Sequence, residues 1–264
     1  MKSPLRKRLP RELKSEFGKY LVVFIMMAIT IGFVSGFLVA DGSMLRAYDD
    51  SFQKYNIEDG YFQTKKKLTP AQKEDIEKSD VKVYENFYIE QKLTNGSTIR
   101  FFKNRKEVDK VCLMNGKMPK KSGEIAVDRM YADNNELKVG DTVKSRKKTF
   151  RITGLVALSD YSALFQNNND TMFDAVKFGV AIVTDKDFEA LNQVKVQYNY
   201  AWIYDKKPAT EKKEKKMAED LMEDMADVVT IESFVPQYQN QSIHFTGDDM
   251  GSDRAMMVML LYIV

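Results

Sequence analysis

Twenty consecutive residues without a charge, Leu21 to Ala40, constrain this chain more than any other feature. At about 1.5 Å per residue, a helix of this length crosses the roughly 30 Å hydrocarbon core of a bilayer. A cleavable signal peptide is the alternative, but its apolar part usually covers roughly 7 to 15 residues. The sequence FLVADGS that ends this stretch also lacks a small-residue cleavage pattern. We therefore expect a retained transmembrane helix at residues 20–40.

Basic residues gather on one side of this segment, which predicts its orientation. Residues 1–20 carry seven basic side chains against two acidic ones, whereas residues 41–60 carry only Arg46 and Lys54 as basic side chains. Positively charged flanks stay in the cytoplasm, so the amino terminus is expected to be cytoplasmic. The seven basic residues are Lys2, Arg6, Lys7, Arg8, Arg11, Lys14 and Lys19.

Residues 1–19 also place Leu5, Leu9, Leu13 and Phe17 at four-residue intervals. Two interpretations stay open for this basic segment. It is either an amphipathic helix on the inner membrane face, opened by a proline at position 10, or simply the positive flank of the membrane helix.

Small and apolar residues bear on two further properties of the amino-terminal helix. Ala28, Gly32 and Gly36 follow one another at four-residue intervals, and two interpretations stay open: the spacing lets a second membrane helix approach closely, or it is a chance occurrence of the kind that is common in apolar segments. Beyond the membrane, apolar residues recur every three to four positions, which predicts a helical stalk at residues 41–56. These stalk residues are Met44, Leu45, Tyr48, Phe52 and Tyr55.

Residues 57–250 change to short alternating runs and turn residues, so we expect a large extracytoplasmic core domain of the α+β class. Asn95-Gly96 between two alternating runs predicts a β-hairpin. Thr69 and Pro70 predict the start of one helix, and a Met217, Leu221, Met225 stripe opposite a Glu211–Lys215 pair predicts another. The expected strands are VKVYENFYIEQKL, STIRFFKN, EIAVD, TVKSRKKTFRITGLVAL, GVAIVT and YNYAWIY, and the expected helices are TPAQKEDIEKS, DKDFEALNQ and ATEKKEKKMAEDLMEDMADV.

The sequence offers no catalytic, cofactor-binding or metal-binding residues. It contains no P-loop, no G-x-S-x-G, no H-E-x-x-H and no C-x-x-C motif. The single cysteine, Cys112, excludes an internal disulfide, and it pairs with the single histidine, His244, only if the fold brings them together. The acidic run TGDDMGSDRA lacks the spacing of a calcium loop, and Ser252 or Asp253 is expected to cap the next helix instead. A net charge of +3 gives no reason to expect a nucleic-acid partner.

One stretch is more specific: NGKMPKKSGEIAVDRMYADNNELKVGDTVKSRKKTFRITGLVALSDYSALF, residues 115–165. It resembles the signature of the extracytoplasmic core domain in the FtsX/MacB-like ABC transporter permeases. The start of the chain, RELKSEFGKYLVVFIMMAITIGFVSG, is similar to the first membrane segment of that family. The residues that match the signature are Gly116, Pro119, Gly123, Glu124, Ile125, Gly140, Asp141 and Gly154, and we expect them to be turn and fold determinants rather than ligands.

The resemblance implies a non-catalytic permease subunit in a bacterial cell membrane, which pairs with a second permease copy or homologue and with a separate ATP-binding subunit. Such permeases export lipids, peptides or drugs, or they transmit force to partners outside the membrane. A single-pass adhesin or sensor with a ligand-binding outer domain is the alternative. A membrane-anchored hydrolase would need a catalytic constellation that the sequence does not show.

The final residues, AMMVMLLYIV at 255–264, are uncharged and mostly apolar. A helix of this length reaches only about 15 Å, half of a bilayer. We expect residues 251–264 to be the outer start of a second transmembrane helix, capped near Ser252, which continues in the natural protein. The alternative is a short helix that packs on the domain.

Overall fold

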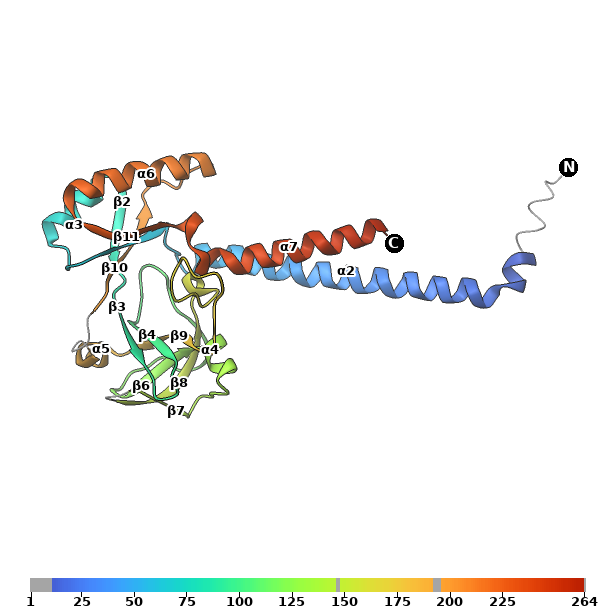
Figure 1. Ribbon diagram of the computed structural model, residues 1–264, viewed down its shortest axis with the longest axis horizontal. Helices are drawn as coiled ribbons and strands as arrows, with labels where there is room; N and C mark the ends of the chain where they lie inside the picture. The colour runs from blue at the N-terminus through green and yellow to red at the C-terminus, as the bar shows by residue number, and fades with distance from the viewer. Residues whose placement is uncertain (1–10, 146–147, 192–195, 264) are drawn as a thin grey trace. The chain divides into compact units, whose positions relative to one another are not determined.

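The computed structural model describes residues 11–145, 148–191 and 196–263 (Figure 1). Contacts within the chain divide it into two units. One unit comprises the described parts of Met1–Asp49 and Gly247–Val264, and the other is Asp50–Thr246. Part of the basic segment 1–19, including Leu5, Leu9 and the proline at position 10, lies outside the described residues.

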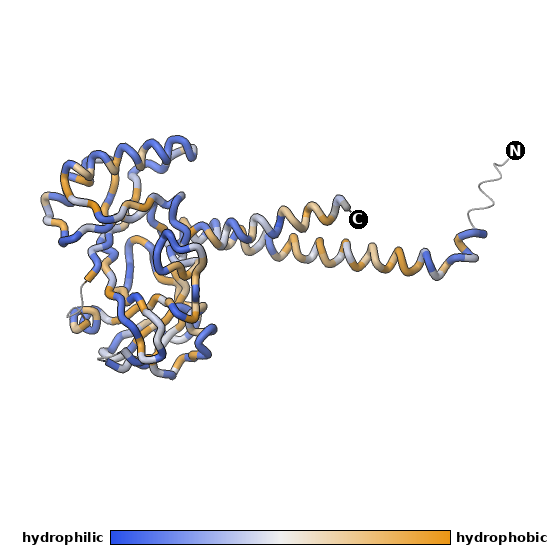
Figure 2. Tube along the Cα trace, viewed as in Figure 1, coloured by the Kyte–Doolittle hydropathy of each residue, from blue (hydrophilic) through white to orange (hydrophobic). Residues whose placement is uncertain are grey.

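Helix α2, Phe17–Lys54, passes without interruption through both the predicted membrane segment and the predicted stalk. No proline interrupts this stretch, so all its backbone N–H groups can serve the helix. Its apolar side chains are exposed, including Phe24, Ile29 and Phe33, as expected for a helix surrounded by lipid. Figure 2 shows this half of the helix as a continuous hydrophobic stretch. Among the described helices, α2 is the one long and apolar enough to cross a membrane.

Helix α7, Gln241–Ile263, begins well before the expected cap, so the prediction of a start near Ser252 was wrong. Asn240 caps the helix instead, since its Oδ1 accepts the Ser242 backbone N–H at 3.1 Å. The polar first half of α7 resembles a loop in sequence, but Gly247 lies against Tyr48 of α2, where an added Cβ would be 2.7 Å from the ring. The polar first half of α7 is thus helical where it contacts α2, and the sequence alone does not show this contact between two helices.

The unit Asp50–Thr246 contains a four-stranded antiparallel sheet in the order β11-β1-β10-β2. Its strands are β1 Gly60–Thr64, β2 Val81–Glu85, β10 Tyr198–Tyr204 and β11 Ile231–Pro236. Helices α3, Pro70–Glu77, and α6, Glu211–Val228, pack on this sheet. Between them lies an aromatic core that includes Phe62, Tyr200 and Trp202.

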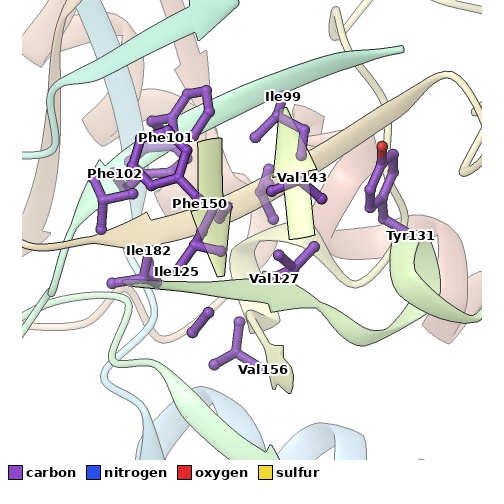
Figure 3. Close-up of a cluster of buried hydrophobic side chains, with 14 of the residues drawn as sticks. Ile99, Phe101, Phe102, Ile125, Val127, Tyr131, Val143, Phe150, Val156 and Ile182 are labelled. Carbon is purple, nitrogen blue, oxygen red and sulfur yellow. The ribbon is translucent and has the colours of Figure 1, made fainter. Parts of the chain in front are cut away.

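The second sheet of this unit is mixed, with parallel pairs β4·β9 and β6·β8 among antiparallel ones. Its order is β3-β4-β9-β6-β8-β5, and β7 pairs with β8. Figure 3 shows its core of aliphatic and phenylalanine side chains, among them Phe101 and Phe150. The strands are β3 Tyr88–Lys92, β4 Thr98–Lys103, β5 Cys112–Gly116, β6 Glu124–Asp128, β7 Thr142–Lys144, β8 Thr149–Ala157 and β9 Phe178–Val183, with helices α4 Arg129–Asn134 and α5 Asp185–Leu191. The expected α+β class, with an apolar amino-terminal helix and a large sheet-rich domain, is confirmed.

Local sequence signals account for several of these elements. Asn95-Gly96 closes the predicted hairpin between β3 and β4, with Gly96 at φ 89°. Thr69 begins α3 in a capping box with Gln72. Lys215 Nζ lies 2.5 Å from Glu211 Oε1 on α6, and Leu221 and Met225 are buried beneath it. These predictions are confirmed.

Other expected strands were wrong in extent. VKVYENFYIEQKL divides at Asn86 into β2 and β3, which belong to different sheets. The run TVKSRKKTFRITGLVAL contains two strands, β7 and then β8. Strands β1, β5 and β11 were not predicted, because they are short and lack clear alternation. Their positions depend on pairing with strands far away in sequence, which local patterns do not report.

Candidate functional site

A polar cavity of about 360 Å³ lies in the unit Asp50–Thr246, lined in part by the four-stranded sheet. In the register of this sheet Gln63 of β1 lies between Asn199 of β10 and Ser233 of β11. Side chains directly opposite one another in a sheet share a face, and successive residues alternate between faces. The row Asn199–Gln63–Ser233 is therefore on the face opposite the neighbouring aromatic row, which contains Phe62 and belongs to the core.

Carboxamide side chains dominate the lining of this cavity. It contains nine of the chain's 23 asparagine and glutamine residues. Two amide-rich runs, FQNNND and PQYQNQ, supply several of them and would have been the sequence signal for the site. The nine residues are Gln63, Asn86, Gln166, Asn167, Asn168, Asn169, Asn199, Gln239 and Asn240.

The two amide-rich runs are fastened to each other. Asn168 Nδ2 donates to the Gln239 carbonyl oxygen, and Asn168 Oδ1 accepts from the Gln241 backbone N–H, each at 2.9 Å. Ser162 makes a similar connection nearby, since its hydroxyl lies 2.8 Å from the carbonyl oxygens of Ser242 and Ile243. The wall of the cavity is thus held in place by side-chain to backbone hydrogen bonds between segments about 70 to 80 positions apart in sequence.

Arg100 of β4 lies in the wall, and each of its three guanidinium nitrogens donates a hydrogen bond. Its Nε and Nη2 donate to Glu90 Oε1 at 2.9 and 2.5 Å, and its Nη1 donates to the Tyr161 hydroxyl at 2.6 Å. Nη2 also reaches the Gln166 carbonyl oxygen at 2.8 Å, and the guanidinium group covers the Tyr88 ring at 4.1 Å. Arg100 is therefore a structural cation whose charge Glu90 balances.

A second set of charged groups borders the cavity. Arg105 donates to both carboxylate oxygens of Asp160, at 2.5 and 2.9 Å, and its Nη1 lies 3.9 Å from Asp109. Asp109 accepts from the backbone N–H of Glu58 at 2.9 Å and from Asn86 Nδ2 at 3.1 Å. Burial, with the nearby Asp160 carboxylate, raises the pKa of Asp109 to about 7.

Glu58 completes this set as a second acid with a raised pKa. Burial is the main reason that its pKa lies well above the ordinary value, and the charges of Asp109 and Asp160 raise it further. A hydrogen bond between the Glu58 and Asp109 side chains favours the proton on Glu58. With one proton on this pair, the positive charge of Arg105 and the negative charges of Asp160 and Asp109 leave the set with a net charge of −1.

This arrangement can bind polar groups, but it shows no catalytic pair. Its carboxylates are engaged by Arg105 and by one another, so none is positioned as a free base. Cys112 contacts Met114 Sδ at 3.7 Å and also bonds Tyr55, whereas His244 Nε2 is buried and has no hydrogen-bond partner within the described residues. Among the described residues, no hydrogen bond joins Cys112 and His244. Over residues 11–145, 148–191 and 196–263, no group of three acidic, histidine or cysteine side chains is arranged to hold a metal ion.

The residues of the sequence motif lie in strands β5, β6 and β8 and in the turns between β5 and β7, and none of them lines the cavity. Gly116 and Gly154 are paired between β5 and β8, and a Cβ on Gly116 would lie 2.3 Å from the Thr153 carbonyl oxygen. Glu124 accepts from the backbone N–H groups of Lys120 and Lys121, each at 2.8 Å, and these donors lower its pKa. Gly116, Gly154 and Glu124 therefore contribute to the backbone conformation and pairing of these strands.

Comparisons with known proteins find similarity in solved structures only. No family model matches the chain, and no curated protein matches it either. The extracellular domain of the noncanonic ABC-type transporter YknZ from Gram-positive bacteria is 12% identical at a TM-score of 0.34, and the match covers 66% of this chain and 98% of that domain. The periplasmic region of MacB from Actinobacillus actinomycetemcomitans is 14% identical at a TM-score of 0.35, and the match covers 66% and 87%. Both similarities thus concern domains outside the membrane, and each covers 66% of this chain.

Proposed function

We propose that this chain is a membrane permease subunit of an ABC transporter, which couples ATP hydrolysis by a separate subunit to export or to mechanical signalling outside the membrane. The main supporting observation is the continuity of α2, an exposed apolar helix that runs without a break to Lys54. The two-sheet domain that contains the permease-like motif begins there. In this proposal residues 1–19 are cytoplasmic and residues 57–250 are extracytoplasmic, because the basic flank precedes the membrane segment.

The geometry of α2 suits the transmission of movement. A helix of 38 residues is about 57 Å long at about 1.5 Å per residue, well beyond the roughly 30 Å of the hydrocarbon core. Within the domain, the chain that follows the helix is fixed, since the backbone N–H groups of Lys110 and Asp109 donate to the carbonyl oxygens of Tyr55 and Asn56 at 2.8 and 3.0 Å. These hydrogen bonds therefore connect the carboxyl end of α2 to the segment just before β5, so a displacement of the helix end would be passed to that segment.

The first turn of α7 has a comparable attachment inside the same unit. Ser162 bonds the carbonyl oxygens of Ser242 and Ile243, and the Thr246 hydroxyl donates to the Ser162 carbonyl oxygen at 3.1 Å. Phe245 also packs edge-on against Phe165 and Phe173, with ring centres 5.5 and 5.3 Å away. Two helices thus enter the domain through specific contacts, as a mechanically coupled subunit requires.

The partners follow from the same proposal: an ATP-binding subunit, a second permease copy or homologue, and the lipid bilayer. The test is to purify the tagged protein from its native membrane in a mild detergent and to identify the chains that accompany it. A P-loop ATPase that co-purifies and hydrolyses ATP in the complex is the expected result. A protein recovered without any ATPase would reject the proposal and favour the single-pass adhesin or sensor.

A further inference from the structure

We infer that the polar cavity of the two-sheet domain is a binding site for a neutral, polyhydroxylated ligand, a mono- or disaccharide unit. This goes beyond the proposed function, because binding would be a property of the unit Asp50–Thr246 whether or not an ATPase is coupled to it. The volume of about 360 Å³ lies within the roughly 300 to 1,000 Å³ of typical small-molecule sites.

Asn199 provides the first reason to expect a ligand. Its side chain is 7% exposed, and its Oδ1 has no hydrogen-bond partner anywhere in the part of the chain that the structure describes. A buried carboxamide oxygen that accepts no hydrogen bond is costly, so such atoms normally meet a ligand or a bound water. Asn199 lies on the sheet face that lines the cavity, beside Gln63.

The neighbours of Asn199 extend this surface with further hydrogen-bonding capacity. Gln63 uses its Nε2 to donate to the Tyr88 hydroxyl at 3.1 Å, which leaves its carbonyl oxygen available. Ser233 lies beside Gln63 on β11 and adds a hydroxyl. The row Asn199–Gln63–Ser233 thus presents donors and acceptors side by side across three strands.

Tyrosine hydroxyls add donors from the sheet and from the facing wall. The Tyr161 oxygen accepts from Arg100 and the Tyr88 oxygen accepts from Gln63, so the proton of each hydroxyl remains available to a ligand. Tyr61 also lines the cavity and adds a third hydroxyl. Burial raises the pKa of Tyr61, which keeps this hydroxyl protonated.

The charges around the cavity argue against an anionic ligand. Glu90 balances Arg100 and Arg105 balances Asp160, whereas Glu58 and Asp109 share one proton and keep one negative charge. An anion would therefore find no unpaired cation among the described side chains that line the site. An apolar ligand would leave the carboxamides and hydroxyls without partners, which is unfavourable.

A sugar fits this lining better than a peptide. A carboxamide carries a donor and an acceptor close together, so it can bond two adjacent hydroxyl groups of a sugar ring at once. A peptide usually gains its affinity by adding a strand at a sheet edge. Here the lining residues of β1 and β10 lie on strands interior to the sheet order β11-β1-β10-β2, whose backbone groups pair with neighbouring strands. The edge strand β11 also contributes lining residues, so the peptide is included in the test as a comparison.

The experiment uses the whole chain in phosphatidylcholine nanodiscs, because detergents with sugar headgroups would compete. Maltose and N,N′-diacetylchitobiose are titrated by ligand-observed NMR at up to about 10 mM, which is ten times a Kd of about 1 mM. Trialanine serves as the peptide comparison. We expect one of the two sugars to bind, and we expect Asn199→Ala and Gln63→Ala each to weaken that binding at least tenfold. The matched control, Gln91→Ala on β3, removes a carboxamide outside the cavity and is expected to leave the affinity unchanged.

Three outcomes would overturn the inference. No binding of either sugar by the wild-type chain would reject it, as would sugar binding that persists in both Asn199→Ala and Gln63→Ala. Binding of trialanine alone, lost in the same variants, would assign the cavity to peptides instead. The unfolding temperature of each variant, followed by Trp202 fluorescence, separates lost binding from lost folding. A second set of nanodiscs contains a diglucosyl lipid and distinguishes two sources of the sugar. If the cavity takes a lipid headgroup, this lipid displaces the titrated disaccharide. If the cavity takes a free sugar only, the disaccharide stays bound.

Discussion

Arg105 and Asp160 form a two-point ion pair inside the domain, with Nη1 2.5 Å from Oδ2 and Nη2 2.9 Å from Oδ1. Their side chains are only 6% and 4% exposed. Arg105 follows β4, and Asp160 lies in the short 3-10 turn Ser159–Tyr161 that follows β8. The pair therefore fastens the loop with the amide-rich run to the end of a strand, and it contributes to the shape of the cavity wall.

Replacement of this cation is expected to destabilise the domain strongly. Arg105→Met would leave Asp160 as a buried carboxylate without its partner, a change that typically costs about 3–5 kcal/mol. Trp202 is the single tryptophan and is fully buried, so its fluorescence reports unfolding of the domain in urea. Arg129→Met is the control. The Arg129–Asp133 ion pair is exposed, its Nη1 and Oδ2 atoms are 3.8 Å apart, and such pairs contribute about 0–1 kcal/mol. Equal losses in the two variants would contradict this account of the pair.

The acids beside this pair predict a dependence of stability on pH. The pKa of Asp109 is raised to about 7 and that of Glu58 is raised well above its ordinary value, so the folded protein binds more protons than the unfolded chain. The free energy of unfolding contributed by these groups is therefore highest below about pH 4 and falls as the pH rises toward about 7. Because Glu58 and Asp109 share a proton, the fall belongs to the pair.

Glu58→Gln tests this assignment. A glutamine keeps a donor for Asp109 but cannot ionise, so the fall in unfolding temperature between about pH 4 and 7 should become shallower than in the wild type. The same Trp202 fluorescence, recorded at each pH, provides the measurement. The other charged groups that face this pair, Arg105 and Asp160, are unchanged in the variant. An identical slope in variant and wild type would show that other groups cause the pH dependence.

Gly116 of the permease-like motif is expected to tolerate no side chain. It has φ 77°, and a Cβ there would lie 2.3 Å from the Thr153 carbonyl oxygen. Gly140 also has a positive φ of 107°, but nothing lies within 4 Å of its Cβ position. Gly140→Ala should therefore cost only the backbone penalty of about 1–2 kcal/mol, whereas Gly116→Ala should cost clearly more. Urea unfolding measures the loss in free energy of unfolding for each variant. Equal losses would show that close packing at Gly116 adds no cost beyond the backbone penalty.

The sequence predicted those features that depend on neighbouring residues. The capping box at Thr69, the Asn95-Gly96 hairpin and the buried stripe with Leu221 are all set by local spacing. The cavity was not predicted, because Gln63 and Asn199 are far apart in sequence and only the pairing of β1 with β10 makes them neighbours. Single polar residues on strands look like solvent-facing positions until the fold shows that another wall covers them. The runs FQNNND and PQYQNQ were the available signal, but polar runs of this kind also describe ordinary loops.

The orientation of α2 remains a prediction, and labelling of single cysteines in intact cells measures it directly. Cys112 is first changed to serine, and a cysteine is then introduced either at Lys14, before the membrane segment, or at Glu223, on the exposed face of α6. Ser97 in the hairpin is a poor reporter, because it is 3% exposed and bonded to Tyr131. With seven basic residues before Leu21, an impermeant thiol reagent should label Glu223→Cys in intact cells and Lys14→Cys only after permeabilisation. The opposite pattern would place the two-sheet domain in the cytoplasm, and it would remove the basis for an extracytoplasmic permease domain.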